Sequence, residues 1–219
     1  MNKTDKNGFD DMAAFARSRL KGRSFAGIAK RSGGCFDEEK NLFRIKSLGK
    51  EICLLLPGLE CESPETDLWQ YLVLLHYLDL ADGAAFPGQW MSFGEMKDGL
   101  VRGTKFDKSS SAELSGIFEN KDEVQIRQLL SGLCAESAPG KADISAVISF
   151  LPNFPFFINI WLADEEFPVS AKLLVPKSAD HYLTIEDAVT AGEIVIEALR
   201  RQLCSDILFA VRLWHFTYI

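Results

Sequence analysis

Three ionisable side chains in the second half of the sequence have types and a spacing that could support chemistry. Asp164 and Glu166 stand two residues apart, so an extended backbone would direct both carboxylates to one face. Carboxylates that close can raise one another's pKa or share a hard cation. His181 follows the next apolar segment, and its imidazole would complete an acid/base or metal-assisted site if the fold joined the two regions. These three residues are candidate catalytic groups of a hydrolase or lyase.

The same charges also have a purely structural explanation, which we favour. The acidic run stands between two alternating apolar segments, where a hairpin needs a polar tip. Glu186 and Asp187 stand at a predicted helix start, where acidic side chains complement the helix dipole. No metal ligand set is assigned on this basis, and enzymatic activity stays an open question.

Aromatic residues suggest a second type of site. Trp90 and Trp161, together with Asn159, could line a pocket for a flat ligand, although large aromatic side chains are more often part of a core. The sequence contains no nucleophile elbow, phosphate-binding loop, H-E-x-x-H motif or dinucleotide fingerprint. It therefore identifies no cofactor.

Apolar periodicity predicts the elements that must position these residues in the first two thirds of the chain. A helical stripe runs from Phe9 to Leu20, and residues 42–56 alternate as a hairpin around Gly49. Ser63, followed by Pro64, predicts a helix start. The segment with Gly99 and Gly103 is predicted as loops. Two further helices are expected to begin at Ser110 and Asn120, each with a glutamate three residues later.

The last third of the chain predicts a sheet and a long helix. A strand over 143–150 is followed by alternating segments at 156–162 and 169–175, which should pair as an antiparallel hairpin with Asp164–Glu166 at its tip. Thr184 then begins a helix, with Asp187 in the reciprocal capping position. Because the strands occur in hairpins, the expected fold is α+β, an antiparallel sheet packed by helices.

Composition limits the classes of protein. The 219 residues suit a single α+β domain over 1–219, with residues 1–8 frayed and an apolar extension at 205–219. A net charge of −7 argues against a nucleic-acid partner. We find no signal peptide and no apolar run long enough for a bilayer, so we expect a cytoplasmic protein with no membrane partner. The five cysteines include no closely spaced pair.

Three stretches resemble an uncharacterised prokaryotic family, a domain of unknown function. They are IAKRSGGCFDEEKNLFRIKSLGKEICLLLP, FPGQWMSFGEMKDG and IWLADEEFPVSAKLLVPKSADHYLTIEDA. The family pattern G-x-W-x-x-F is matched by Gly88, Trp90 and Phe93. The pattern W-x-x-D-x-E-F-P is matched by Trp161, Asp164, Glu166, Phe167 and Pro168. The resemblance covers about residues 25–204. Some relatives look fused to a four-cysteine iron–sulfur module similar to that of corrinoid iron–sulfur proteins, a module that this chain lacks.

The resemblance implies an architecture but no reaction. Together with the missing catalytic motifs, it favours an accessory domain that binds a small molecule or a partner protein, linked to anaerobic cofactor or one-carbon metabolism. The metal-assisted hydrolase or lyase that uses Asp164, Glu166 and His181 is one alternative. The other is a structural homodimer joined through the apolar C-terminal tail, because an exposed patch of that kind would be a liability.

Overall fold

The computed structural model describes residues 3–216, and it describes side chains for residues 8–203. Within this part of the chain, six α-helices combine with two antiparallel sheets, one of four strands and one of five. The arrangement confirms the predicted α+β class and the construction of the sheets from hairpins.

The smaller sheet, sheet A, is a meander of consecutive strands. These are β1 (Cys35–Asp37), β2 (Leu42–Ser47), β3 (Lys50–Leu55) and β4 (Glu60–Cys61). β2 and β3 pair from Leu42 with Leu55 to Ser47 with Lys50, which confirms the predicted hairpin. Alternate residues of these two strands are buried. One face of sheet A therefore packs against the core, as the alternation of apolar residues in the sequence predicts.

The larger sheet, sheet B, has the strand order β5-β9-β8-β7-β6. Its strands are β5 (Trp90–Met91), β6 (Glu136–Ser137), β7 (Ile144–Leu151), β8 (Phe154–Trp161) and β9 (Ser170–Pro176). β8 and β9 form the predicted antiparallel hairpin, with Trp161 opposite Ser170 next to the tip. The two sheets approach one another where Leu48 N–H donates to the carbonyl of Ser149 on β7.

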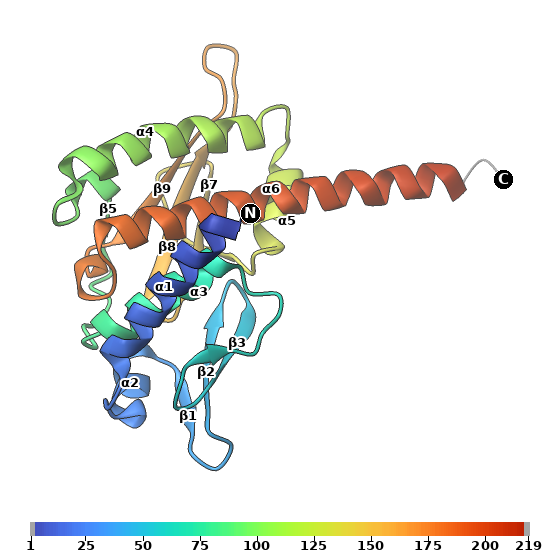
Figure 1. Ribbon diagram of the computed structural model, residues 1–219. Helices are drawn as coiled ribbons and strands as arrows, with labels where there is room; N and C mark the ends of the chain where they lie inside the picture. Colours follow the sequence, from blue (N-terminus) through green and yellow to red (C-terminus); the bar gives the residue numbers. More distant parts are fainter. Residues whose placement is uncertain (1–2, 217–219) are drawn as a thin grey trace.

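The helices lie mainly on one side of sheet B. They are α1 (Lys3–Leu20), α2 (Phe25–Ser32), α3 (Leu68–Leu80), α4 (Gly99–Phe118), α5 (Glu123–Ser131) and α6 (Ile185–Phe216), with short 3-10 turns at Phe93–Glu95 (η1) and Ala179–His181 (η2). Figure 1 shows α4 and α6 crossing the same face of sheet B, with α1 and α3 between them and sheet A. α1 begins before the expected start at Phe9. Among the described residues, no helix has the length and apolar character needed to cross a bilayer.

Aromatic rings form the centre of the core. Phe93, Phe150, Phe154 and Phe156 are all fully buried. The ring centroid of Phe156 lies 5.4 Å from that of Phe154, 5.7 Å from that of Phe150 and 6.0 Å from that of Phe93. These pairs join β7, β8 and the segment before α4, so the inner face of sheet B and the helix layer share one core.

The helix predicted to start at Ser63 begins later than expected. α3 starts at Leu68, and Asp67 is its N-cap, accepting hydrogen bonds from the amides of Trp69 and Gln70. The hydroxyl of Ser63 instead accepts from the amide of Cys53, at 2.9 Å. Ser63 therefore satisfies a backbone group at the edge of sheet A, which is a competing use of the same side chain.

The segment predicted as loops around Gly99 and Gly103 is the first half of α4. Gly103 is buried where the helix crosses the backbone of Phe93 and Gly94, so glycine here permits close approach instead of breaking the helix. The predicted helix start at Ser110 was also wrong. Ser110 lies inside α4, and its hydroxyl donates to the carbonyl of Asp107.

Of the two remaining predicted helix starts, one differs from the structure and one is confirmed. The helix predicted from Asn120 begins at Glu123, and its capping box is formed by Asp122 and Gln125. Thr184 does cap α6: its hydroxyl accepts from the amide of Asp187 and donates to the carboxylate of Asp187. The side chains of residues 204–219, on which the homodimer prediction depends, lie outside those described.

Candidate functional site

The predicted acidic tip is a self-contained turn. Asp164 Oδ1 accepts from the amides of Glu166, at 2.8 Å, and Phe167, at 2.7 Å. These bonds hold the pKa of the Asp164 carboxyl below its usual range. Glu166 and Phe167 are exposed. The Asp164 carboxylate thus organises the loop between β8 and β9, where it is already committed to two backbone donors.

His181 lies at the other end of β9 from this tip. β9 runs from Ser170 to Pro176, and a strand of that length spans about 20 Å. The Nδ1 of His181 contacts the carboxylate of Asp82, at 2.6 Å. The structure therefore brings Asp164 and Glu166 into one loop but does not bring His181 to them. Within residues 8–203, no group of three His, Cys, Asp or Glu side chains is arranged to hold a metal ion.

Trp90, Asn159 and Trp161 share one face of sheet B. Trp90 stands opposite Pro176 of β9, Asn159 opposite Lys172, and Trp161 opposite Ser170, so the pleat directs all three to the face away from the buried Phe156 and Ile158. Neighbouring groups already contact two of them. Trp90 stacks on Phe157 with ring centroids 5.0 Å apart, and Asn159 Oδ1 accepts from the hydroxyl of Ser145.

A cleft of about 650 Å³ opens between α3, α6 and the turn that joins β2 to β3. This volume is typical of sites for small molecules. Its lining combines apolar and polar residues: Ser47, Leu48, Lys50, Glu65, Asp67, Trp69, Gln70, Arg102, Gly132, Leu133, Thr190, Glu193, Ile194, Glu197, Ala198, Arg201 and Gln202.

Trp69 is the largest apolar side chain of the cleft and is 48% exposed. Asp67 caps the helix directly before it, and the ring of Phe9 contacts the indole edge-on at 6.0 Å. The neighbouring Gln70 donates to the hydroxyl of Ser47, at 2.7 Å, which ties α3 to sheet A. The indole of Trp69 is therefore positioned by its contact with Phe9 and still has an exposed surface, which is suited to stacking against a planar molecule.

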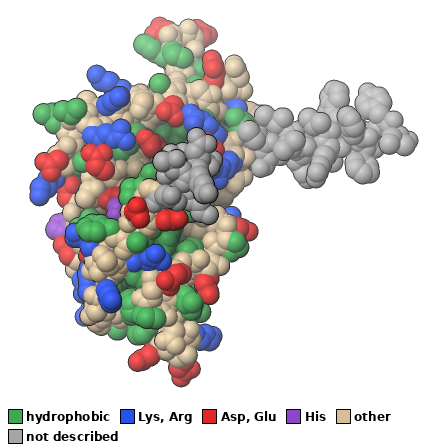
Figure 2. Space-filling model, in the orientation of Figure 1, with side chains coloured by type: hydrophobic (Ala, Val, Ile, Leu, Met, Phe, Trp, Pro, Cys, Tyr) green, Lys and Arg blue, Asp and Glu red, His purple; other side chains and the backbone are tan. Residues whose placement is uncertain are grey.

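Each cation of the cleft lining forms an ion pair with a carboxylate of the same lining. Lys50 contacts Glu65 at 2.7 Å, Arg102 contacts Glu193 at 3.8 Å, and Arg201 contacts Glu197 at 3.2 Å. Lys50 also holds the pKa of Glu65 below its usual range. Figure 2 shows basic and acidic side chains interspersed over the face of the molecule that it draws. Because every cation of the lining has an anionic neighbour, the cleft favours a neutral or zwitterionic ligand over a strongly charged one.

A second cleft, of about 620 Å³, contains the exposed thiols of Cys35 and Cys134. Cys35 stands opposite Arg44 on β2, whereas Cys134 lies against Gly49 in the turn after β2. The stretch of β2 from Arg44 to its end at Ser47 alone spans about 10 Å. The two thiols therefore lie at opposite ends of this cleft and do not form a dithiol site.

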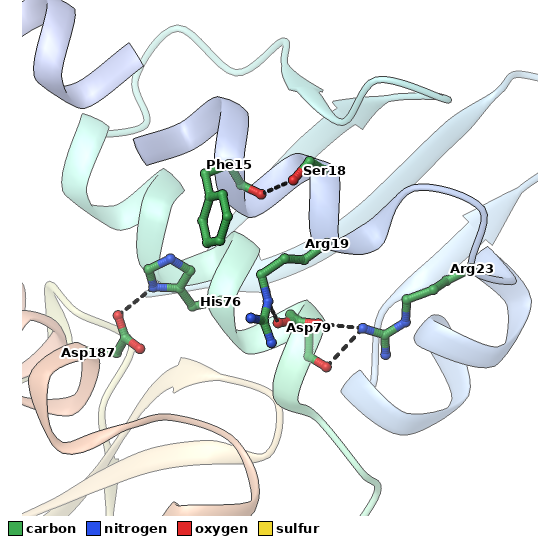
Figure 3. A network of polar contacts seen from close by, with 7 residues as sticks. All are labelled: Phe15, Ser18, Arg19, Arg23, His76, Asp79 and Asp187. Carbon is green, nitrogen blue, oxygen red and sulfur yellow. Dashed lines mark hydrogen bonds and ion pairs between the residues drawn. The ribbon is translucent and has the colours of Figure 1, made fainter. Parts of the chain in front are cut away.

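Two histidine–aspartate pairs lie beyond the end of the first cleft. His76 Nδ1 of α3 contacts the carboxylate of Asp187 at the start of α6, at 2.6 Å. This hydrogen bond raises the pKa of His76, against the opposing effect of its partial burial. Figure 3 shows the imidazole pointing to Asp187 with Phe15 beside it, and Asp79 held between Arg19 and Arg23. The other pair is His181 with Asp82.

No sequence motif indicated the cleft or its residues. Trp69, Arg102 and Glu193 come from α3, α4 and α6, and none belongs to a motif. The spacing of two residues could have indicated this surface. Trp69 and His76 stand seven residues apart, a separation that places both on one face of a helix. A polar and an aromatic side chain on the same face of an otherwise buried helix indicate a surface that something other than the core contacts.

Comparison with known proteins gives one match. The sequence model of a family described as "Domain of unknown function (DUF3786)" matches residues 24–198. The match confirms the resemblance to an uncharacterised family that the sequence motifs indicated. No curated protein and no solved structure matches the chain.

Proposed function

The chain belongs to the DUF3786 family, and from that premise we propose that it is an accessory domain that binds a small planar molecule in the cleft beside Trp69. The observation that carries this proposal is the exposed, firmly held indole in a cleft of about 650 Å³. The family match includes every lining residue except Arg201 and Gln202. The binding site is therefore a property of the family region of the chain.

The chemistry of the lining narrows the ligand class. The ring stacks on Trp69, and its polar edge lies near Gln70 and Thr190, which can exchange hydrogen bonds with heteroatoms. The lining carries four carboxylates and three cations, so its net negative charge disfavours a doubly negative phosphate ester. Neutral heteroaromatic compounds fit these requirements best.

We expect at least one member of a panel of lumiflavin, biopterin, purine nucleosides and indole derivatives to stabilise the protein. A ligand at one hundred times its Kd adds about 2.7 kcal/mol to the free energy of unfolding. For a chain of this size that corresponds to a rise in Tm of about 5–10 °C. Trp69→Leu removes the stacking surface, which should weaken binding about tenfold, and thermal shift with fluorescence titration would measure both effects.

Trp161→Leu is the matched control, because Trp161 lies on the opposite face of sheet B from the helices. Its binding of the same compound should equal that of the wild type. Failure of the whole panel to stabilise the protein would count against ligand binding in the cleft. If Trp161→Leu abolished binding and Trp69→Leu did not, the site would be the face that carries Trp90, Asn159 and Trp161.

A further inference from the structure

The two histidine–aspartate pairs join the same two segments of chain. His76 and Asp82 belong to α3 and the residues after it, and they contact Asp187 and His181, respectively. In one pair the segment with α3 supplies the histidine, and in the other pair it supplies the aspartate. The first contact of one segment is made with the last residue of the other, so the two segments run antiparallel. Both contacts are 2.6 Å long. We call this arrangement the clasp.

Two tyrosines fill the clasp between its polar ends. The rings of Tyr77 and Tyr182 stack with centroids 5.6 Å apart, and both side chains are fully buried. The hydroxyl of Tyr182 donates to the carbonyl of Ala84, and that of Tyr77 donates to the carbonyl of Ser32. The clasp therefore holds residues 181–187 against α3 through an apolar centre with a titratable pair on each side.

The His76–Asp187 pair, which we call the inner pair, lies next to the ligand cleft. The His181–Asp82 pair is the outer pair. Along α3, Trp69 and His76 are seven residues apart, and along α6, Asp187 and Ile194 are also seven residues apart. Seven residues form two helical turns, or about 10 Å, so each pair of residues shares one helix face. The His76–Asp187 contact thus joins α3 to α6 about 10 Å beyond Trp69 and Ile194, and Asp187 stands one helical turn before Thr190, which also lines the cleft.

We propose that the clasp is a proton-controlled latch, in which charged His76 holds α3 to α6 and keeps one end of the cleft closed. The proposal concerns regulation of the same cleft and therefore rests on the proposed function. Loss of the proton removes one charge from the contact with Asp187 and leaves an ordinary hydrogen bond. α3 and α6 then separate more readily, and a ligand leaves the cleft faster.

The groups around His76 support this assignment. Asp187 faces it from α6, Asp79 lies one turn away on α3, and Arg19 approaches from α1. Arg19 is itself bound to Asp79, at 2.5 Å, and Asp79 is shared with Arg23, so the charge of Arg19 is offset only in part and opposes the effect of Asp187 on the pKa of His76. The hydroxyl of Thr184 donates to the second oxygen of Asp187, at 2.7 Å, and fixes that carboxylate. His76 keeps partial contact with solvent, which gives protons access.

The direction of the effect follows from the raised pKa of His76. A group whose folded-state pKa exceeds its unfolded value contributes stability that is complete below about pH 6.5 and is lost as the pH rises through the folded-state pKa. In the outer pair, His181 holds the pKa of Asp82 below its usual range, so Asp82 is ionised throughout this window. The latch is closed at mildly acidic pH and opens towards alkaline pH.

Amide hydrogen exchange between pH 5.5 and 8.5 tests the latch without any ligand. Protection factors in the second half of α3 and in residues 181–187 should fall with pH, about tenfold for each unit by which the folded pKa of His76 exceeds its unfolded value. His76→Gln keeps a hydrogen-bonding side chain without a titratable charge, and its protection factors should fall with pH less steeply than those of the wild type. Glu65→Gln removes a cleft ion pair without a histidine and should retain the wild-type slope.

Equal slopes in the wild type and in His76→Gln would overturn the latch, as would the absence of any slope. Should His76→Gln not fold, nuclear magnetic resonance titration of the wild-type imidazole replaces it. The pKa of His76 should then lie above 6.5 and fall towards that value in Asp187→Asn. An unshifted wild-type pKa would contradict the proposal.

A second measurement, the Kd of a ligand as a function of pH, distinguishes the latch from ligand binding itself. The Kd of lumiflavin, a neutral planar fluorophore, should increase between pH 5.5 and 8.5 in the wild type and stay constant in His76→Gln. If lumiflavin binds with a Kd that is independent of pH, the latch does not control the cleft. If neither lumiflavin nor the rest of the panel binds at any pH while the exchange response is present, the proposed function fails and the proton-dependent clasp remains.

Discussion

Replacing Phe156 by alanine is expected to lower the free energy of unfolding by about 3–5 kcal/mol. Phe156 is fully buried on β8, and its ring contacts those of Phe93, Phe150 and Phe154. The substitution removes the apolar contacts and leaves a cavity lined by three rigid rings, which cannot collapse to fill it. Urea denaturation would measure the loss, and Tm should fall by about 10 °C or more.

Phe167→Ala provides the control for this prediction. Phe167 is 67% exposed in the loop between β8 and β9, so its removal should change stability by less than about 0.5 kcal/mol. A loss for Phe156→Ala no larger than that for Phe167→Ala would mean that the aromatic cluster is not the centre of the core.

Gly103→Ala should destabilise the protein by about 3 kcal/mol, although alanine is the better helix former. A Cβ atom at position 103 would overlap the carbonyl group of Phe93 and lie 2.8 Å from the amide nitrogen of Gly94. Both obstacles are backbone atoms, so α4 would have to move away from the segment that precedes it. Denaturant unfolding measures the change.

Gly116 offers the opposite case in the same helix. A Cβ atom there meets nothing within 4 Å, so Gly116→Ala should stabilise the protein by about 0.5–1 kcal/mol. If Gly103→Ala stabilised the protein as Gly116→Ala is expected to do, the close approach of α4 to the backbone of Phe93 would not explain the glycine at 103.

The hairpins could be predicted because their pattern is local. Phe43 and Ile45 alternate with the polar Arg44 and Lys46 on β2. Phe156, Ile158 and Ile160 recur at every second position of β8 and lie on its buried face, so the period of two indicated both strands. Thr184 was recognised as a cap because Asp187 stands at the reciprocal position. In these segments local preference and tertiary packing agree.

Boundaries were missed where a residue type serves two purposes. Ser63 is of a residue type that favours the N-cap position, but its hydroxyl accepts a hydrogen bond from the amide of Cys53 in sheet A. Asp67 caps α3 instead. Glycine is common in loops, but Gly103 lies inside α4, where the helix approaches the backbone of Phe93 too closely for a side chain. Only the tertiary partner distinguishes these uses, and the partner lies elsewhere in the sequence.

The candidate site was the least predictable part for the same reason. The tip with Asp164 is a local arrangement, and the sequence did predict its turn. The cleft is built from Trp69, Arg102 and Glu193 on three separate helices, which no spacing rule connects. Asp187 was assigned only a local role, as a helix-cap partner, whereas the structure also joins it to His76 of α3.

The strand connectivity also determines the order in which the molecule can assemble. Sheet A pairs neighbours along the chain, whereas β5 reaches β9 only after two helices and three strands have intervened. Closing so long a loop costs more entropy than closing a hairpin, and β5 contributes only two residues of pairing in return. The edge that carries Trp90 is therefore expected to dock last during folding and to detach first from the native state.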